Sequence, residues 1–103
     1  MARFRDLSDE LDLAVVGPSR RRFIVRANPF IGATMLIVAS FVELDLRQAT
    51  PAPTGIEIHA IVIAGRLLIK ARPEWRLDGE PASEAPLLRV VALSRLGKVS
   101  IDR

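Results

Sequence analysis

Short segments in which apolar and polar residues alternate recur along this 103-residue chain. In the three clearest, apolar residues take every second position and charged or polar residues take most of the others; these lie at residues 42–47, 67–72 and 99–103. A period of two is typical of a β-strand that buries one face. Seven prolines and six glycines divide the chain, and no window between them carries a long helical stripe. The pattern predicts an all-β chain, with one short helix over residues 4–11, which Asp6 or Ser8 would cap.

These segments belong to a repeated unit. Each of them follows an apolar segment, and the apolar segments lie at residues 36–41, 60–64 and 90–93. Leu44, Ile69 and Ile101 take equivalent positions, 25 and 32 residues apart, and the loop at 78–86 accounts for the longer step. The tetrapeptide Glu-Leu-Asp-Leu also occurs twice, at 10–13 and 43–46. The repeats favour strand pairs stacked as a short β-helix-like solenoid, each burying its face against its neighbours. An ordinary β-sandwich, whose strands also alternate, is the alternative.

The length of the chain fits one small domain. We expect an N-terminal segment at residues 1–21, holding the short helix or an edge strand, and the solenoid domain at residues 22–103. The absence of cysteine excludes disulfides and zinc–cysteine clusters. The longest uncharged stretch, residues 27–42, is shorter than the ~20 residues of a membrane-spanning helix. No signal-peptide pattern opens the chain, so we expect a soluble, cytoplasmic protein.

The repeat units resemble a known family. The stretch "IVASFVELDLRQA" at residues 37–49 is similar to the first core motif of the LiaF-like C-terminal domain, the cell-wall-active-antibiotic response family. The stretch "TGIEIHAIVIAGRLLIKARPEW" at 54–75 resembles the second unit of that family, which ends in Pro-x-Trp, and "LLRVVALSRLGKVSIDR" at 87–103 resembles the closing coil. The resemblance covers residues 22–103. Family members usually carry paired glycines at the corners; here the first corner, placed at Phe41–Val42, has none, and the others keep only Gly65 and Gly97.

This resemblance implies a right-handed β-helix-like fold and a non-enzymatic role in bacterial envelope-stress signalling. It implies no catalytic residues. The membrane-spanning segments that often precede the domain are missing, so we expect a free-standing, diverged member.

The residues themselves also offer little catalytic chemistry. His59 is the only imidazole, and no serine lies in a nucleophile motif. Glu43 and Asp45 lie about 7 Å apart on one strand face, but Arg47 continues that face, which predicts a solvated ladder of alternating charges. No glycine-rich phosphate loop is present. We therefore expect no enzyme activity, no cofactor and no metal.

The strongest candidate for an interaction site is a cluster of arginines. Its tentative partner-binding residues are Arg20, Arg21, Arg22, Phe23 and Arg26. Such a patch suits an acidic protein partner or the inner surface of the membrane. Nucleic acid is a weaker alternative, because Phe23 could stack on a base but no recognisable nucleic-acid-binding motif is present.

The apolar content indicates a further interface. We expect self-association through the solenoid ends or edges, with a polymerising, bactofilin-like scaffold as the alternative to a discrete oligomer. Among the aromatic residues, Phe30 and Phe41 are predicted to lie in the core, and Trp75 to pack over the edge of the solenoid.

Overall fold

The computed structural model describes residues 2–7, 10–81 and 83–103, with side chains from residue 10 onward. Every regular element in this part of the chain is a β-strand, which confirms the all-β prediction. The strands are β1 (Ala2–Leu7), β2 (Glu10–Val16), β3 (Arg20–Ile24), β4 (Gly32–Val38), β5 (Phe41–Asp45), β6 (Ile56–Ile63), β7 (Arg66–Lys70), β8 (Arg76–Leu77), β9 (Leu87–Arg95) and β10 (Lys98–Asp102). No helix of the described residues is long and apolar enough to cross a membrane.

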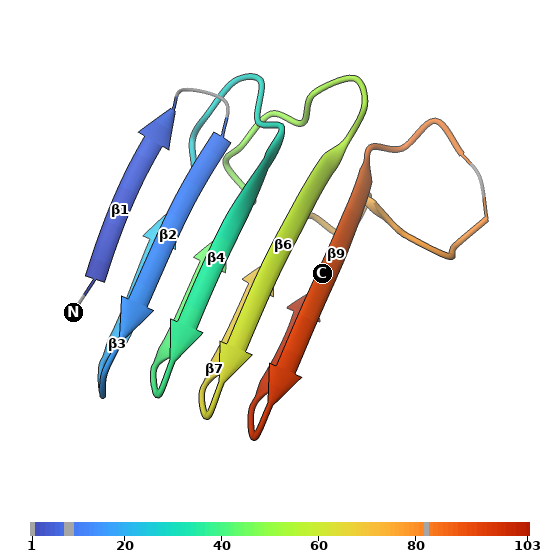
Figure 1. The fold of residues 1–103 in the computed structure, drawn as a ribbon. Helices are drawn as coiled ribbons and strands as arrows, with labels where there is room; N and C mark the ends of the chain where they lie inside the picture. The colour runs from blue at the N-terminus through green and yellow to red at the C-terminus, as the bar shows by residue number, and fades with distance from the viewer. Residues whose placement is uncertain (1, 8–9, 82) are drawn as a thin grey trace.

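The chain passes back and forth between two sheets. The front sheet has the order β1-β2-β4-β6-β9-β8 and the back sheet the order β10-β7-β5-β3 (Figure 1). Consecutive strands form four strand pairs, β2–β3, β4–β5, β6–β7 and β9–β10, each lying beside the one before. All neighbours pair in parallel except β1 and β2. An ordinary sandwich has antiparallel sheets instead.

The register of the sheets matches the predicted repeat. Leu44 pairs with Ile69, and Ile69 pairs with Ile101, so the three equivalent positions form one row across the back sheet. The longer second step holds β8 and the loop before β9, as expected. The two Glu-Leu-Asp-Leu segments are not equivalent, because residues 10–13 lie in the front sheet and residues 43–46 begin in β5 of the back sheet.

The hydrophobic core fills the space between the two sheets. Alternate residues of β2, β4 and β6 are buried, as are alternate residues of β5 and β7. Phe30 is buried as predicted. Trp75, which was expected to pack over the edge of the solenoid, is buried in the core cluster, with the Arg72 guanidinium 5.9 Å from its ring centre. The largest fully buried side chains are Phe30, Leu13, Ile37, Leu44, Leu46, Ile58, Leu67, Ile69, Leu88, Val15, Val42 and Val62.

The N-terminal segment contains strands where a helix was expected. β1 covers residues 4–7 and β2 begins at Glu10; the register between the two strands runs from Ala2 opposite Val15 to Leu7 opposite Glu10. The helix prediction is wrong because the period of two continues through β2, whose Leu11, Leu13 and Val15 join the common core. Residues 8 and 9, including the proposed cap Ser8, lie outside the described residues. The division expected after residue 21 falls inside β3.

The corners between the sheets keep a left-handed residue even where glycine is absent. Ala39, Ala64 and Leu96 have φ of 55°, 50° and 54°. The corner that was expected at Phe41–Val42 therefore lies at Ala39 and Ser40, between β4 and β5. The next residue in each later corner packs tightly, since a Cβ on Gly65 would lie 2.5 Å from the carbonyl oxygen of Ser40. At these later corners, the close approach of neighbouring backbone therefore favours glycine at the second position. The left-handed φ at the first position is a weaker restriction, since alanine and leucine adopt it.

This difference predicts unequal effects on stability at two adjacent residues. Gly65→Ala should lower the free energy of unfolding by about 2 kcal/mol or more, because the new Cβ meets backbone. Ala64→Gly should change it by less than about 1 kcal/mol, since relief of the left-handed strain offsets the added chain entropy. Urea denaturation of both variants measures the effects. A larger loss for Ala64→Gly than for Gly65→Ala would contradict this account of the corners.

Candidate interaction surfaces

A charge ladder crosses the outer face of the back sheet. The Arg22 Nε lies 2.7 Å from a Glu43 carboxylate oxygen, and Lys70 Nζ lies 3.6 Å from the other. Asp45 accepts hydrogen bonds from Arg47 Nη2 at 2.8 Å and from Arg22 Nη2 at 3.3 Å. The Asp45 side chain is only 2% exposed, so the predicted solvated ladder is wrong at this residue. The arginines cover its carboxylate and replace water.

The surroundings of Asp45 favour its charged form strongly. Hydrogen bonding from the Arg47 side chain lowers the pKa of this carboxyl far below its usual range. Burial opposes the lowering of the pKa, while the Arg47 backbone N–H and the Arg22 side chain add to it. A carboxylate with so low a pKa is a poor general base, which fits a structural role in joining β3 and β5.

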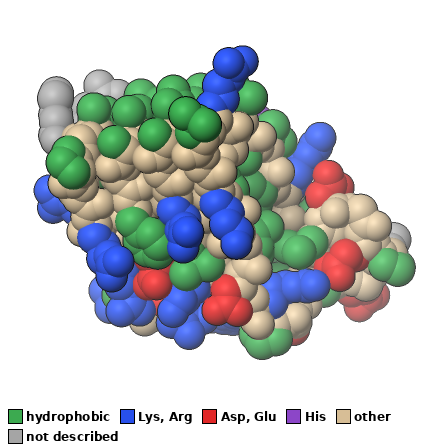
Figure 2. Space-filling view, turned by 90° about the horizontal axis from the view of Figure 1, so that it is seen from below, with side chains coloured by type: hydrophobic (Ala, Val, Ile, Leu, Met, Phe, Trp, Pro, Cys, Tyr) green, Lys and Arg blue, Asp and Glu red, His purple; other side chains and the backbone are tan. Residues whose placement is uncertain are grey.

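Five cations outside this ladder gather at one corner of the molecule. We call this set the basic corner: it consists of Arg20, Arg21, Arg66, Arg95 and Lys98. All lie where front-sheet strands end or back-sheet strands begin, and all are exposed. Within the described part of the chain, none has a carboxylate within 4.0 Å. Figure 2, which views the molecule from this side, shows Lys and Arg side chains gathered below a row of hydrophobic ones.

The structure divides the predicted arginine patch. Arg20 and Arg21 belong to the basic corner, whereas Arg22 is engaged by Glu43 and Asp45. Arg26 lies beyond the other end of β3 and donates a hydrogen bond to Gln48 at 2.8 Å. Phe23 is half-buried against the core and is no open stacking platform.

The sequence reading missed Arg66, Arg95 and Lys98, which flank the later corners. The glycine at each of these corners could have identified two of the three cations, because Arg66 follows Gly65 and Lys98 follows Gly97. Phe41 was predicted to lie in the core, but it occupies the outer row with Arg20 and Arg66. Its ring centre lies 5.0 Å from the Arg20 guanidinium and 6.0 Å from that of Arg66, an arrangement that favours both cations.

An apolar band lies on the outer face of the front sheet, next to the basic corner. Its large exposed members are Val16, Leu36, Ile61, Ile63, Val91 and Leu93. Register places Leu36, Ile61 and Leu93 in one row across three strands. At the corner itself, Leu96 is 93% exposed between Arg95 and Lys98. Hydrophobic and cationic groups therefore meet at the same end of the strands.

The last strand pair leaves part of the core open. Val90, Val99 and Ile101 are half-buried and Ala92 is exposed, although each pairs with a fully or nearly fully buried residue of the preceding strand pair. β8 pairs only with Leu87 and Leu88 of β9. Among the described strands, β10 has β7 as its single neighbour. This end consequently presents two strand edges with a partly covered apolar interior.

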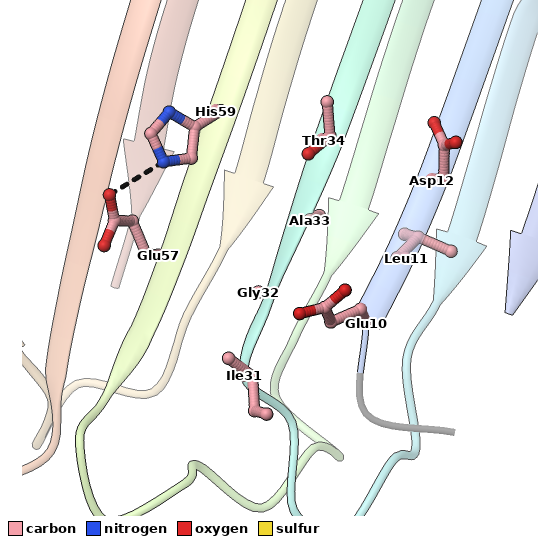
Figure 3. Close-up of a pocket in the computed structure, with 9 residues that line it drawn as sticks. All are labelled: Glu10, Leu11, Asp12, Ile31, Gly32, Ala33, Thr34, Glu57 and His59. Atoms are coloured by element: carbon pink, nitrogen blue, oxygen red, sulfur yellow. Dashed lines mark hydrogen bonds and ion pairs between the residues drawn. The ribbon is translucent and has the colours of Figure 1, made fainter. Parts of the chain in front are cut away.

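A polar hollow of about 400 Å³ lies at the opposite end of the front sheet. Figure 3 shows Glu10 beside Gly32 and Asp12 opposite Thr34. His59 is joined to Glu57 by a contact of 2.7 Å between Nε2 and Oε1. The described residues contain no group of three His, Asp or Glu placed to hold a metal ion. The described residues that line the hollow include three carboxylates, those of Glu10, Asp12 and Glu57, and none of them is a serine, cysteine or lysine.

No family model, curated protein or solved structure matches this chain.

The buried carboxylate leads to a prediction about pH. Asp45→Asn should lower the free energy of unfolding by about 2 kcal/mol at pH 7, because charged hydrogen bonds are lost. The folded-state pKa of Asp45 lies below the unfolded one, so its stabilisation is complete above about pH 5. It is lost as the pH falls below about 4 and through the folded-state pKa.

Urea denaturation between pH 7 and about pH 2 measures this difference. Glu74→Gln is the control, because the Glu74 side chain is 63% exposed and touches Arg72 only at 4.0 Å; its effect should stay within about 0.5 kcal/mol. A gap between wild type and Asp45→Asn that remains constant down to pH 2 would show that the Asp45 charge contributes nothing.

Proposed function

We propose that this chain is a non-enzymatic protein-interaction module of the LiaF-like type, built as a short right-handed β-helix-like solenoid. It acts in the cytoplasm of a bacterium in envelope-stress signalling, by associating with itself and by binding a regulator. The motif resemblance across residues 22–103 supports the family assignment, and the parallel strand pairs support the solenoid. The difference between the two ends of the sheets carries the proposal of self-association.

The N-terminal end does not continue the series of parallel strand pairs. In the front sheet, β1 runs antiparallel to β2, so it does not present the parallel edge of a further strand pair. In the back sheet, β3 is the edge, and Arg21 occupies the row of Val42 and Leu67 that faces the core. A charge in an inward-facing row of an edge strand discourages the addition of another strand.

The C-terminal end has no such protection and is complementary to itself. If two β10 strands pair antiparallel with Ser100 opposite Ser100, Lys98 of each copy lies opposite Asp102 of the other. The half-buried Val99 and Ile101 then face each other across the junction. Cross-strand pairs of opposite charge and of β-branched residues both stabilise antiparallel sheets. This end therefore suits a second copy of the same chain.

If chains associate only through their C-terminal ends, the assembly closes as a dimer. Filaments need two different complementary ends, whereas a two-fold contact uses the same surface of both copies. The bactofilin-like scaffold is therefore less supported than the discrete dimer. Nucleic-acid binding is also less supported, because Phe23 packs on the core and Phe41 lies between two arginines.

Size-exclusion chromatography with light scattering, at low and high salt, tests the proposal. The expected species is a dimer whose dissociation constant rises roughly tenfold in Lys98→Glu and in Asp102→Lys. Each single change converts two attractive cross-strand pairs into repulsive ones, worth about 1 kcal/mol in total or more. The double variant Lys98→Glu/Asp102→Lys restores opposite charges and should recover wild-type dimerisation.

Arg26→Glu is a matched charge reversal that lies beyond β3, at the opposite edge of the back sheet from β10, and it should leave the dimer intact. A strictly monomeric protein at high concentration would overturn self-association. Species that grow with concentration and persist in high salt would instead favour the polymerising scaffold.

A further inference from the structure

We propose that the basic corner, together with Leu96 and the adjoining apolar band, docks on the surface of an anionic lipid bilayer. This surface shares only Lys98 with the β10 edge, and the inference does not depend on self-association. It assigns a binding role to Arg66 and Leu96, and it places Arg20 and Arg21 in one surface with them.

The charges of the protein are sorted along the strand direction. Of the acidic groups on the back sheet, Glu43 and Asp45 are held by Arg22, Arg47 and Lys70. The acidic hollow lies at the far end of the front-sheet strands, as the position of Glu10 at the start of β2 shows. Among the residues that the structure describes, the basic corner thus has no carboxylate within 4.0 Å. The positive electrostatic potential is therefore concentrated at the end of the molecule where the front-sheet strands end and the back-sheet strands begin.

The spacing of the cations suits a flat anionic surface. Arg20, Phe41, Arg66 and Lys98 form one row across the four strands of the back sheet. With about 4.8 Å between strands, the row extends over about 14 Å. Arg95 projects from the last front-sheet strand on the other side of the Leu96 corner. The corner residues between these two sides form a ridge, which several lipid headgroups could contact at once (Figure 2).

The apolar groups favour a bilayer over a soluble polyanion. Leu96 is almost fully exposed, and Ile63 and Leu93 are 40% and 56% exposed near the same end of the front sheet. A bilayer offers negative headgroups with hydrocarbon directly beneath them, so it satisfies both kinds of side chain together. A nucleic acid or an acidic peptide would satisfy only the cations. In addition, the Phe41 ring is not open for base stacking, because it lies between two guanidinium groups.

Vesicle sedimentation of the full chain tests the inference. The probes are vesicles of phosphatidylcholine alone and vesicles containing about 30 mol% phosphatidylglycerol. We expect the protein to sediment only with the anionic vesicles, and binding to weaken as salt screens the charges. Arg20→Gln/Arg66→Gln should reduce the partition coefficient at least tenfold.

The matched control is Arg26→Gln/Arg72→Gln. These arginines follow β3 and β7, the same strands that Arg20 and Arg66 begin, so net charge falls equally while the basic corner is intact. This control should bind within about twofold of wild type. Leu96→Ser should weaken vesicle binding at least threefold, and it should leave any binding to soluble polyglutamate unchanged.

Three results would overturn the inference. They are the absence of sedimentation with anionic vesicles, an equal loss in the two double variants, and unchanged vesicle binding by Leu96→Ser. The last result, with tight polyglutamate binding, would assign the basic corner to a soluble acidic partner. None of these readouts depends on Asp102, so a failure of the dimer proposal is recognised separately by light scattering.

Discussion

In-register parallel pairing between successive strand pairs is the constraint on which the rest of this structure depends. Because the strands align without a shift, each row across a sheet collects residues of one kind. Inward rows become stacks of Leu, Ile and Val, as in Leu44, Ile69 and Ile101. Outward rows collect charge in the same way, and the row that begins at Arg20 contains three cations around Phe41. The basic corner is therefore a product of register.

Register also explains how one short sequence acquires two different roles. In the front sheet, the Asp of the first Glu-Leu-Asp-Leu segment is Asp12, which lies half-buried in the row of Thr34 and His59. In the back sheet, the Asp of the second segment, Asp45, is almost fully covered by Arg22 and Arg47. A buried carboxylate is tolerated only when paired and hydrogen-bonded. Of the two arginines that donate hydrogen bonds to Asp45, Arg22 lies on the neighbouring strand β3, and Arg47 follows Asp45 by two residues.

The sequence predicted those features that depend on local pattern. Alternation indicated the strands, and the spacing of Leu44, Ile69 and Ile101 indicated the correct register. Features that depend on contacts between distant residues were not predictable in the same way. The helix expected over residues 4–11 has local capping residues, but pairing with β2 overrides them. Phe41 looked like a core residue by hydrophobicity alone, and only the position of the corner at Ala39 places it on the outer face. Arg66 and Lys98 lie far from Arg20 in sequence, so only stacking brings the three together.

The unequal ends of the two sheets also imply an order of opening. Each strand pair contacts only its neighbours, so the cooperativity of such an array is limited to adjacent units. The pair β9–β10 is covered on one side only, and its Val90, Ala92 and Ile101 remain partly accessible. Local opening requires the least free energy where the fewest apolar contacts are broken. The native chain should therefore open from its C-terminal strand pair inward, while β1 and β2 cover the opposite end and β6 and β7 provide the edges on which the detached strands reassemble.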